Sequence, residues 1–193
     1  MNGVQAIRPV MDAINKIPTS LPGVFILEPR VFGDERGFFF ESYNRKIMAD
    51  VGIGEQFVQD NHSCSSRNVL RGLHYQVKQP QGKLVRVVEG EIIDVAVDLR
   101  RSSSTFGRWE SVRLSGENKR MLWIPVGFAH GFCVLSEKAH VLYKATDFYA
   151  PEYERTLAWN DPDLKIKWEL DAEPIVSAKD QRGRPLRDVE GFE

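Results

Sequence analysis

Residue types suited to proton transfer and anion binding lie close together in the segment 69–76, whose sequence is VLRGLHYQ. The segment is typical of a β-strand, on which Arg71 and His74 would face opposite sides. Gly72 lies between them and allows a bend or bulge that would bring both side chains toward one cavity. An arginine binds anionic groups and a histidine exchanges protons near neutral pH, so the pair suits acid–base catalysis on an anion. A surface arginine beside a hydrogen-bonded core histidine would give the same pattern.

A second histidine, His130, follows the pentapeptide PVGFA at 125–129. This P-x-G-x-x-H pattern resembles the second motif of cupins, in which the histidine points into a β-barrel. A metal-binding cupin also carries H-x-H and a glutamate on a partner strand, but here that strand offers only His74, with Gly72 at the first ligand position. Because a tightly held divalent metal usually has three or four protein ligands, we expect no metal. A triad of His62, His74 and His130 is the metal-binding alternative.

Without a metal, side chains must move the protons themselves. His74 is then the candidate base, Tyr143 the candidate acid and Lys83 the cation that would hold developing negative charge. Tyr143 would equally suit an ordinary core position in its strand, and Lys83 a solvated strand end. Asp180, in SAKD at 177–180, is not distinguished locally from any other loop carboxylate.

Polar residues also gather in DERGFFFE at 34–41 and in QDNHS at 59–63. Arg36 in the first segment would suit a phosphate, although a charged hairpin turn before a buried strand explains the segment as well. In the second segment, Gln59 and Asn61 alternate along a strand, which favours a polar cavity wall over a dry core. Capping of a strand edge would use the same residue types.

The elements that must position these side chains are mostly short strands separated by turn residues. Strands are predicted over 24–32, 38–43, 56–64, 69–76, 84–88, 92–99, 109–114, 121–124, 131–135 and 141–148, with a short helix over 45–51. Sustained strand–helix alternation is absent, which argues against a doubly wound sheet. We therefore predict a mainly β fold, a jelly-roll barrel or sandwich with short helices, which the resemblance of the His130 motif implies is of the cupin type. An irregular or weakly helical tail, 151–193, would fold back over it.

The 193 residues suit a single domain, predicted over 17–193, with an N-terminal extension over 1–16. The extension would pack on the body or on a second subunit. Its hydrophobic residues have a helix-like spacing that Pro9 interrupts: Val4, Ile7, Met11 and Ile14.

Charge and cysteine content limit the partners and the compartment. Lys and Arg total 26 and Asp and Glu total 27, a net charge of −1, which argues against binding nucleic acid or membranes through bulk charge. Cys64 and Cys133 form no CxxC pattern, and each is expected to pack as a small hydrophobe in a reducing cytosol. No apolar run approaches a membrane span and no signal-peptide pattern is present, so a soluble cytoplasmic protein is expected.

The combination of motifs closely resembles the dTDP-4-dehydrorhamnose 3,5-epimerase family, cofactor-free cupin-fold enzymes of dTDP-L-rhamnose synthesis. The resemblance runs from Pro18 to Asp180 and leaves out the 1–16 extension. Its seven motifs are GDERGFFFESYN at 33–44, FVQDNHS at 57–63, VLRGLHYQ at 69–76, QGKLVRVVEGEIIDVAVDLR at 81–100, ENKRMLWIPVGFAHGF at 117–132, LYKATDFYAPEYE at 142–154 and SAKD at 177–180.

The resemblance implies a homodimeric isomerase that uses neither cofactor nor metal. His74 would be the general base, oriented by Asp180, and Tyr143 would be the acid on the opposite face of the sugar. Lys83 would steady the enolate oxygen. The positions implied to hold the nucleotide sugar are Arg36, Glu41, Gln59, Asn61, Arg71, His130, Tyr149, Glu154 and Lys179, with Tyr149 against the thymine.

The implied reaction is epimerisation at C3 and C5 of dTDP-4-dehydro-6-deoxy-alpha-D-glucose to dTDP-4-dehydro-beta-L-rhamnose. Both hydrogens are α to the 4-keto group, so a base, a cation near O4 and an acid on the opposite face suffice. A mono-epimerase acting at C3 or C5 of a related dTDP-4-keto-deoxysugar is an alternative, and a metal-dependent cupin enzyme is another. A non-catalytic sugar-nucleotide binding protein would need no acid and base on opposite faces.

Overall fold

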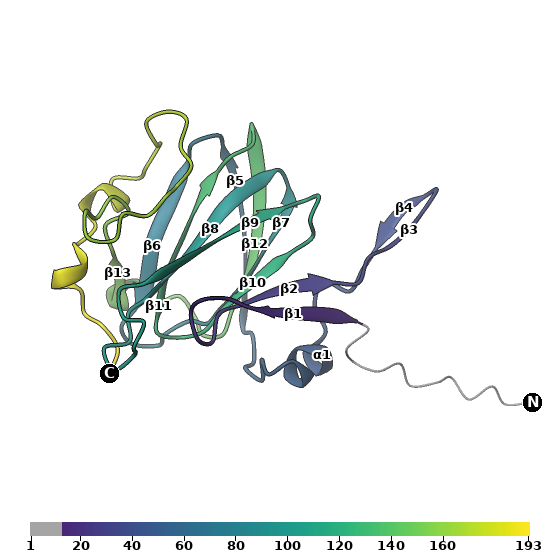
Figure 1. Cartoon of the computed structure of the whole chain (residues 1–193), viewed down its shortest axis with the longest axis horizontal. Helices are drawn as coiled ribbons and strands as arrows, with labels where there is room; N and C mark the ends of the chain where they lie inside the picture. The colour runs from purple at the N-terminus through teal and green to yellow at the C-terminus, as the bar shows by residue number, and fades with distance from the viewer. Residues whose placement is uncertain (1–12) are drawn as a thin grey trace, which may run out of the picture.

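Two antiparallel sheets face each other in the computed structural model, which describes residues 13–193 (Figure 1). The six-stranded sheet has the order β1 (Ile14–Pro18), β2 (Phe25–Pro29), β10 (Met121–Ile124), β7 (Lys83–Glu89), β12 (Lys138–Ala145) and β5 (Gln59–Ser66). The five-stranded sheet has the order β13 (Glu154–Thr156), β6 (Leu70–Gln76), β11 (Phe128–Val134), β8 (Glu91–Asp98) and β9 (Trp109–Ser115). The jelly-roll sandwich predicted from the strand pattern, and the cupin type implied by the resemblance, are confirmed.

A separate hairpin of β3 (Phe32–Asp34) and β4 (Gly37–Phe39) projects away from the two sheets (Figure 1). It is followed by the helix α1 (Arg45–Asp50). The C-terminal tail contains the short 3-10 helices η2 (Pro151–Tyr153), η3 (Asp180–Arg182) and η4 (Leu186–Asp188).

Alternation along the strands builds the main core between the sheets. Val85 and Val87 of β7 pack with Ile92 and Ala96 of β8 and with Val141 of β12, all of them buried. Successive side chains on a strand point to opposite faces, so these positions, two or four residues apart, share the inward face. Removal of this apolar surface from water is the main force holding the two sheets together.

Each sheet also has a covered outer face. Met48 of α1 and Ile53 just after it pack on Met121 and Trp123 of the six-stranded sheet. On the other side the tail forms the predicted cover, with residues such as Trp168 packing among buried side chains of the five-stranded sheet. The tail is therefore part of the folded body and can contribute side chains to a site.

α1 begins and ends where local residues favour it. The Asn44 side chain accepts hydrogen bonds from the backbone N–H groups of Lys46 and Ile47, and Gly52 follows the helix with φ of +91°. The sequence predicts this helix to within one residue. Within residues 13–193, no helix is long and apolar enough to cross a bilayer.

The N-terminal prediction is wrong in one respect. Ile14 belongs to the helix-like spacing over 1–16, but it begins strand β1 and pairs with Pro29 of β2. Continuous backbone hydrogen bonding to β2 outweighs local spacing here, so the folded body begins inside the predicted extension. Val4, Ile7 and Met11 lie outside the described residues. The strand predicted over 38–43 is also shorter, because pairing with β3 ends at Phe39.

Candidate active site

A cavity of about 770 Å³ opens between the two sheets. Its walls come from β5, β7 and β12 on one side, from β6 and β11 on the other, and from residues 175–180 of the tail. The volume is within the range of small-molecule sites. Among the predicted site residues, those that line the cavity are His74, Tyr143, Asp180, Lys83, Gln59, Asn61, Arg71, His130, Tyr149, Glu154 and Lys179.

The bend expected at Gly72 is present. Gly72 has φ of +110°, and a Cβ there would lie 2.6 Å from the carbonyl oxygen of His130, so a side chain would collide with the neighbouring strand. The pairing of β6 with β11 shifts register just after His130. Both Arg71 and His74 consequently line the cavity, where Arg71 Nε donates a hydrogen bond to Ser65 Oγ at 3.0 Å.

His74 is paired with Asp180 of the tail, with 2.6 Å between His74 Nε2 and Asp180 Oδ1. Burial would raise the pKa of Asp180, but the hydrogen bond and charge of His74, with hydrogen bonds from Ser177 and from the Gly72 backbone, lower it below its usual value. An ionised Asp180 accepts the Nε2–H of His74. This tautomer leaves Nδ1 with the lone pair that a general base requires.

Tyr143 comes from the opposite sheet. It lies on β12, whereas His74 lies on β6, and both side chains line the same cavity. Burial, followed by the negative charge of Glu154, raises the pKa of Tyr143, while Arg71 partly opposes the shift. The phenol therefore holds its proton at neutral pH and is suited to act as an acid.

Lys83 is a buried cation of the cavity, with only 7% of its surface exposed. Its Nζ donates one long hydrogen bond, 3.4 Å, to the backbone carbonyl of His74. Burial lowers the pKa of Lys83 to about 8, while the charges of Glu154 and Asp94 raise it and that of Lys179 lowers it. The ammonium group is thus largely desolvated and short of hydrogen-bond acceptors, which suits it to an anion on a bound ligand.

His130 forms a second histidine–carboxylate pair. Its Nε2 lies 2.7 Å from Asp94 Oδ1, within hydrogen-bond distance, and Asp94 is fully buried. Sequence reasoning missed Asp94, although a lone acidic residue inside the apolar stretch EIIDVAV was a usable signal. It also missed Ser63, Gln81 and Ser177 of the lining, which no local pattern distinguishes.

Three side chains of the cavity lining are hydrogen-bonded to each other. Glu154 accepts hydrogen bonds from Lys179 Nζ at 2.9 Å and from the Tyr149 hydroxyl at 3.0 Å. Burial would raise the pKa of Glu154, but the Lys179 hydrogen bond and the charge of His74 lower it overall. Tyr149 itself is 52% exposed, so much of its side chain remains accessible to a flat ligand group.

Polar side chains of β5 form the remaining wall, as alternation predicts. Gln59 Nε2 donates to Asn61 Oδ1 at 3.0 Å. Asn61 Nδ2 is buried and has no hydrogen-bond partner among residues 13–193. An unpaired donor on a cavity wall is available to a ligand acceptor.

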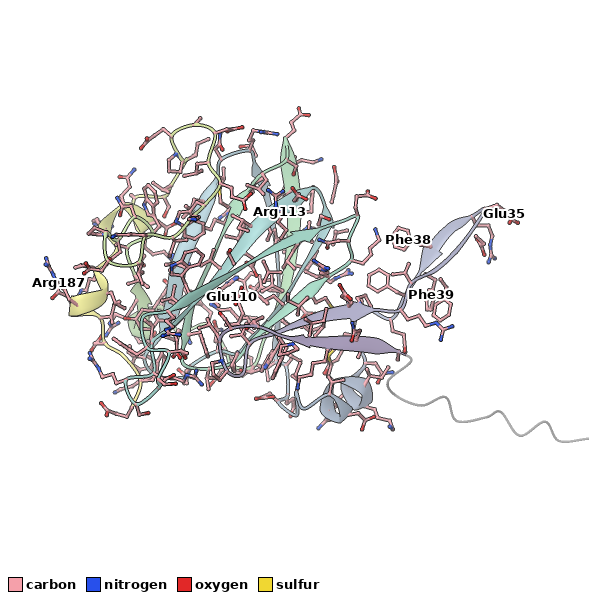
Figure 2. The ribbon with its side chains drawn as sticks, viewed as in Figure 1. Glu35, Phe38, Phe39, Glu110, Arg113 and Arg187 are labelled. Carbon is pink, nitrogen blue, oxygen red and sulfur yellow. The ribbon has the colours of Figure 1, made fainter. Side chains whose placement is uncertain are left out.

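Arg36 and Glu41 are not part of the cavity lining. Arg36 lies on the projecting hairpin, where it is ion-paired with Asp34, and its side chain is 83% exposed. Glu41 follows the hairpin and accepts a hydrogen bond from Asn44. Figure 2 shows the hairpin extending from the body, with Glu35 at its tip. Within one chain, the structure does not bring these two residues to the predicted site.

The histidine triad considered as a metal site does not converge. His74 and His130 line the cavity, whereas His62 is exposed on β5 with its Nε2 3.0 Å from His140 Nδ1. Across the part of the chain that is described, no three His, Cys, Asp or Glu side chains are grouped to hold a metal ion.

One cavity of this cupin-type fold thus holds a histidine oriented by a carboxylate and a tyrosine from the facing sheet, an arrangement suited to proton transfer on a bound ligand. The comparison with known sequences gives the particular family. Residues 18–188 match the family model described as dTDP-4-dehydrorhamnose 3,5-epimerase, and the chain belongs to this family of epimerases.

Curated relatives are similar in sequence to this chain along most of their length. The dTDP-4-dehydrorhamnose 3,5-epimerase of Pseudomonas aeruginosa is 61% identical over 174 residues, covering 90% of this chain and 96% of the relative. The Mycobacterium tuberculosis enzyme of the same name is 38% identical over 173 residues, covering 88% and 86%.

Solved structures show the same fold. The dTDP-6-deoxy-D-glucose-3,5-epimerase of Legionella pneumophila, in complex with dTDP-4-keto-L-rhamnose, has a TM-score of 0.90 at 52% identity, covering 92% of this chain and 95% of that one. A 3'-monoepimerase from Streptomyces bikiniensis, in complex with dTDP-quinovose, has a TM-score of 0.84 at 33% identity, covering 89% and 87%. The fold alone therefore does not separate double from single epimerisation.

Proposed function

We propose that this chain epimerises dTDP-4-dehydro-6-deoxy-alpha-D-glucose at C3 and C5, giving dTDP-4-dehydro-beta-L-rhamnose for dTDP-L-rhamnose biosynthesis. The observation that carries the proposal is the His74–Asp180 pair facing Tyr143 across one cavity. The names of its relatives and the product complex of the Legionella enzyme support the choice of substrate.

The proposed chemistry is two rounds of the same proton transfer. His74 Nδ1 removes the hydrogen α to the carbonyl, and the electron pair of the C–H bond forms an enolate whose negative charge lies on O4. The Lys83 ammonium stabilises that oxygen. Tyr143 then donates its proton to the carbon from the opposite face, which inverts the centre, and solvent returns both groups to their starting protonation states.

We expect two cationic side chains and one exposed tyrosine ring to bind the nucleotide part of the substrate. Arg71 and Lys179 line the cavity and carry the positive charge that phosphate oxygens require. Tyr149 would stack on the thymine, since its ring is half exposed beside Glu154.

In heavy water, the enzyme is expected to place deuterium at both C3 and C5 of the product, because each centre passes through an enolate. Proton NMR of the product reads both positions. The matched substrate is dTDP-glucose, which has no 4-keto group to acidify the hydrogens and should take up no deuterium. Deuterium at one carbon only would replace the proposal with a mono-epimerase, and exchange at neither carbon would refute it.

The proposal includes a homodimer in which the β3–β4 hairpin of each protomer completes the cavity of its partner. Arg36 and Glu41 stand away from their own cavity, and the hairpin exposes Phe38 and Phe39, at 60% and 67%, along its length (Figure 2). Exposed aromatic rings on a projecting element favour burial against a second surface. A second copy would bring the missing arginine to the diphosphate.

Arg36→Ala is expected to raise KM about 10–100-fold, the usual cost of losing a hydrogen bond between charged groups. At substrate concentrations well below the KM of Arg36→Ala, co-expression of Arg36→Ala with His74→Ala should restore roughly a quarter of the wild-type activity, because random pairing makes half of the dimers mixed and each mixed dimer has one complete cavity. Arg187→Ala, which removes another exposed arginine, is the control and should leave KM unchanged. Absence of restored activity in the mixed sample would mean that Arg36 does not serve the partner's cavity.

A further inference from the structure

One buried carboxylate has no part in the chemistry described above. Asp94 lies on the inward face of β8 between Ile92 and Ala96, which belong to the apolar core. Its Oδ1 is paired with His130, but its Oδ2 is buried without a hydrogen-bond partner in the described part of the chain. Burial of a carboxylate is costly unless charges or hydrogen bonds compensate it, so packing alone does not account for this residue.

Asp94 has two basic neighbours that line the cavity. His130 is held by the 2.7 Å hydrogen bond, with Nε2 toward Asp94. Lys83 is coupled to Asp94 through charge, because the carboxylate raises the pKa of this otherwise desolvated ammonium. Neither neighbour has another strong partner: Lys83 makes one long hydrogen bond, and no hydrogen bond within residues 13–193 involves His130 Nδ1.

Strand pairing places this pair next to the proposed base. His130 of β11 lies opposite His74 of β6 on one side and opposite Ala96 of β8 on the other. The histidines of two histidine–carboxylate pairs, His74–Asp180 and His130–Asp94, thus lie on neighbouring strands of one sheet and line one cavity.

Resting on the proposed epimerisation, we infer that Asp94 is a positioning residue: it fixes His130 in the tautomer with a proton on Nε2, and its negative charge also acts on Lys83 in the same cavity. His130 Nδ1 is then free to accept a hydrogen bond from a sugar hydroxyl. Asp94 acts only through these two side chains, because it is not part of the cavity lining.

The pKa of Lys83 depends on burial and on charged side chains from several parts of the fold. The carboxylates that raise its pKa are Asp94 and Glu154, while burial and Lys179 lower it. The other titratable groups that share the cavity are His74, His130, Tyr143 and Asp180. Removal of Asp94 would leave Glu154, itself hydrogen-bonded to Lys179, as the remaining carboxylate that favours the charged amine.

The test is Asp94→Asn, which keeps the shape and removes the charge. NMR titration of Lys83 should give a lower pKa than in the wild type, because loss of a nearby negative charge favours the neutral amine. The alkaline limb of the pH profile of kcat should move to lower pH for the same reason.

The ¹⁵N shifts of His130 should change from an Nε2-protonated ring to a mixed or reversed tautomer, because an amide can donate where the carboxylate only accepts. kcat should fall roughly 10–100-fold with little change in KM, less than the loss of a proton-transfer group.

Asp98→Asn is the matched control. Asp98 is also buried on the inward face of β8, but its partners are Arg100, Ser103 and Thr105, so it perturbs the fold without reaching the cavity. Unchanged Lys83 titration and His130 shifts in Asp94→Asn, or equal changes in Asp98→Asn, would overturn the inference. So would a wild-type His130 without a proton on Nε2, which needs no variant. If the wild type failed to exchange deuterium, the proposed function would fall while these NMR measurements still decided the role of Asp94.

Discussion

His74→Ala is expected to abolish deuterium exchange at both C3 and C5 and to lower kcat about 10²–10⁴-fold, the usual contribution of a general base. The expectation follows from geometry: Asp180 holds the imidazole with its Nε2–H engaged, which leaves Nδ1 as the basic atom. Tyr143 keeps its proton because burial raises its pKa, so it does not substitute as a base. The measurement is the rate of deuterium incorporation by NMR beside the rate of product formation.

Two further variants make this result interpretable. His62→Ala removes an exposed histidine from β5 and should leave exchange unchanged. His74→Gln keeps a donor for the buried Asp180 carboxylate and should fold normally while remaining inactive, which separates loss of the base from loss of stability. Substantial exchange in His74→Ala would show that another group removes the protons.

Tyr143→Phe is expected to separate exchange from inversion. His74 still forms the enolate, so deuterium from solvent can return to the same face, but the acid of the opposite sheet is gone. Net epimerisation should fall roughly 10²-fold or more, while exchange falls much less. Proton NMR of recovered substrate and product measures both rates in one sample.

Tyr75→Phe is the matched control, since it also removes a buried hydroxyl. Tyr75 lies on β6 but packs on the outer side with Phe192, and burial raises its pKa to about 12. This variant should alter stability only and leave both rates near those of the wild type. Equal losses of exchange and epimerisation in Tyr143→Phe would mean that Tyr143 acts in binding or in proton removal.

Features that depend on neighbouring residues in the sequence could be predicted from local patterns. Period-two alternation and turn residues gave the sandwich, because each strand must present one face to the core. Gly72 indicated the bend that brings Arg71 and His74 to one cavity, since a side chain there would meet the neighbouring strand. Alternation along β5 likewise placed Gln59 and Asn61 on the cavity wall.

Pairings between distant residues were beyond such reasoning. Asp180 lies 106 residues from His74, and only the family resemblance distinguished it from other loop carboxylates. Strand β1 was missed because its pairing with β2, rather than its own spacing, determines its conformation. Arg36 has the residue type for phosphate, but no pattern in one chain shows which cavity a projecting hairpin serves.

The distance along the chain between His74 and Asp180 also has a consequence for synthesis. Both sheets, including His74, Lys83 and Tyr143, are encoded before the tail segment that carries Asp180. A chain still being synthesised therefore presents His74 before the carboxylate that pairs with it. Under the proposed mechanism, His74 would gain its oriented tautomer only once the tail has docked, so an unfinished chain would lack the paired base.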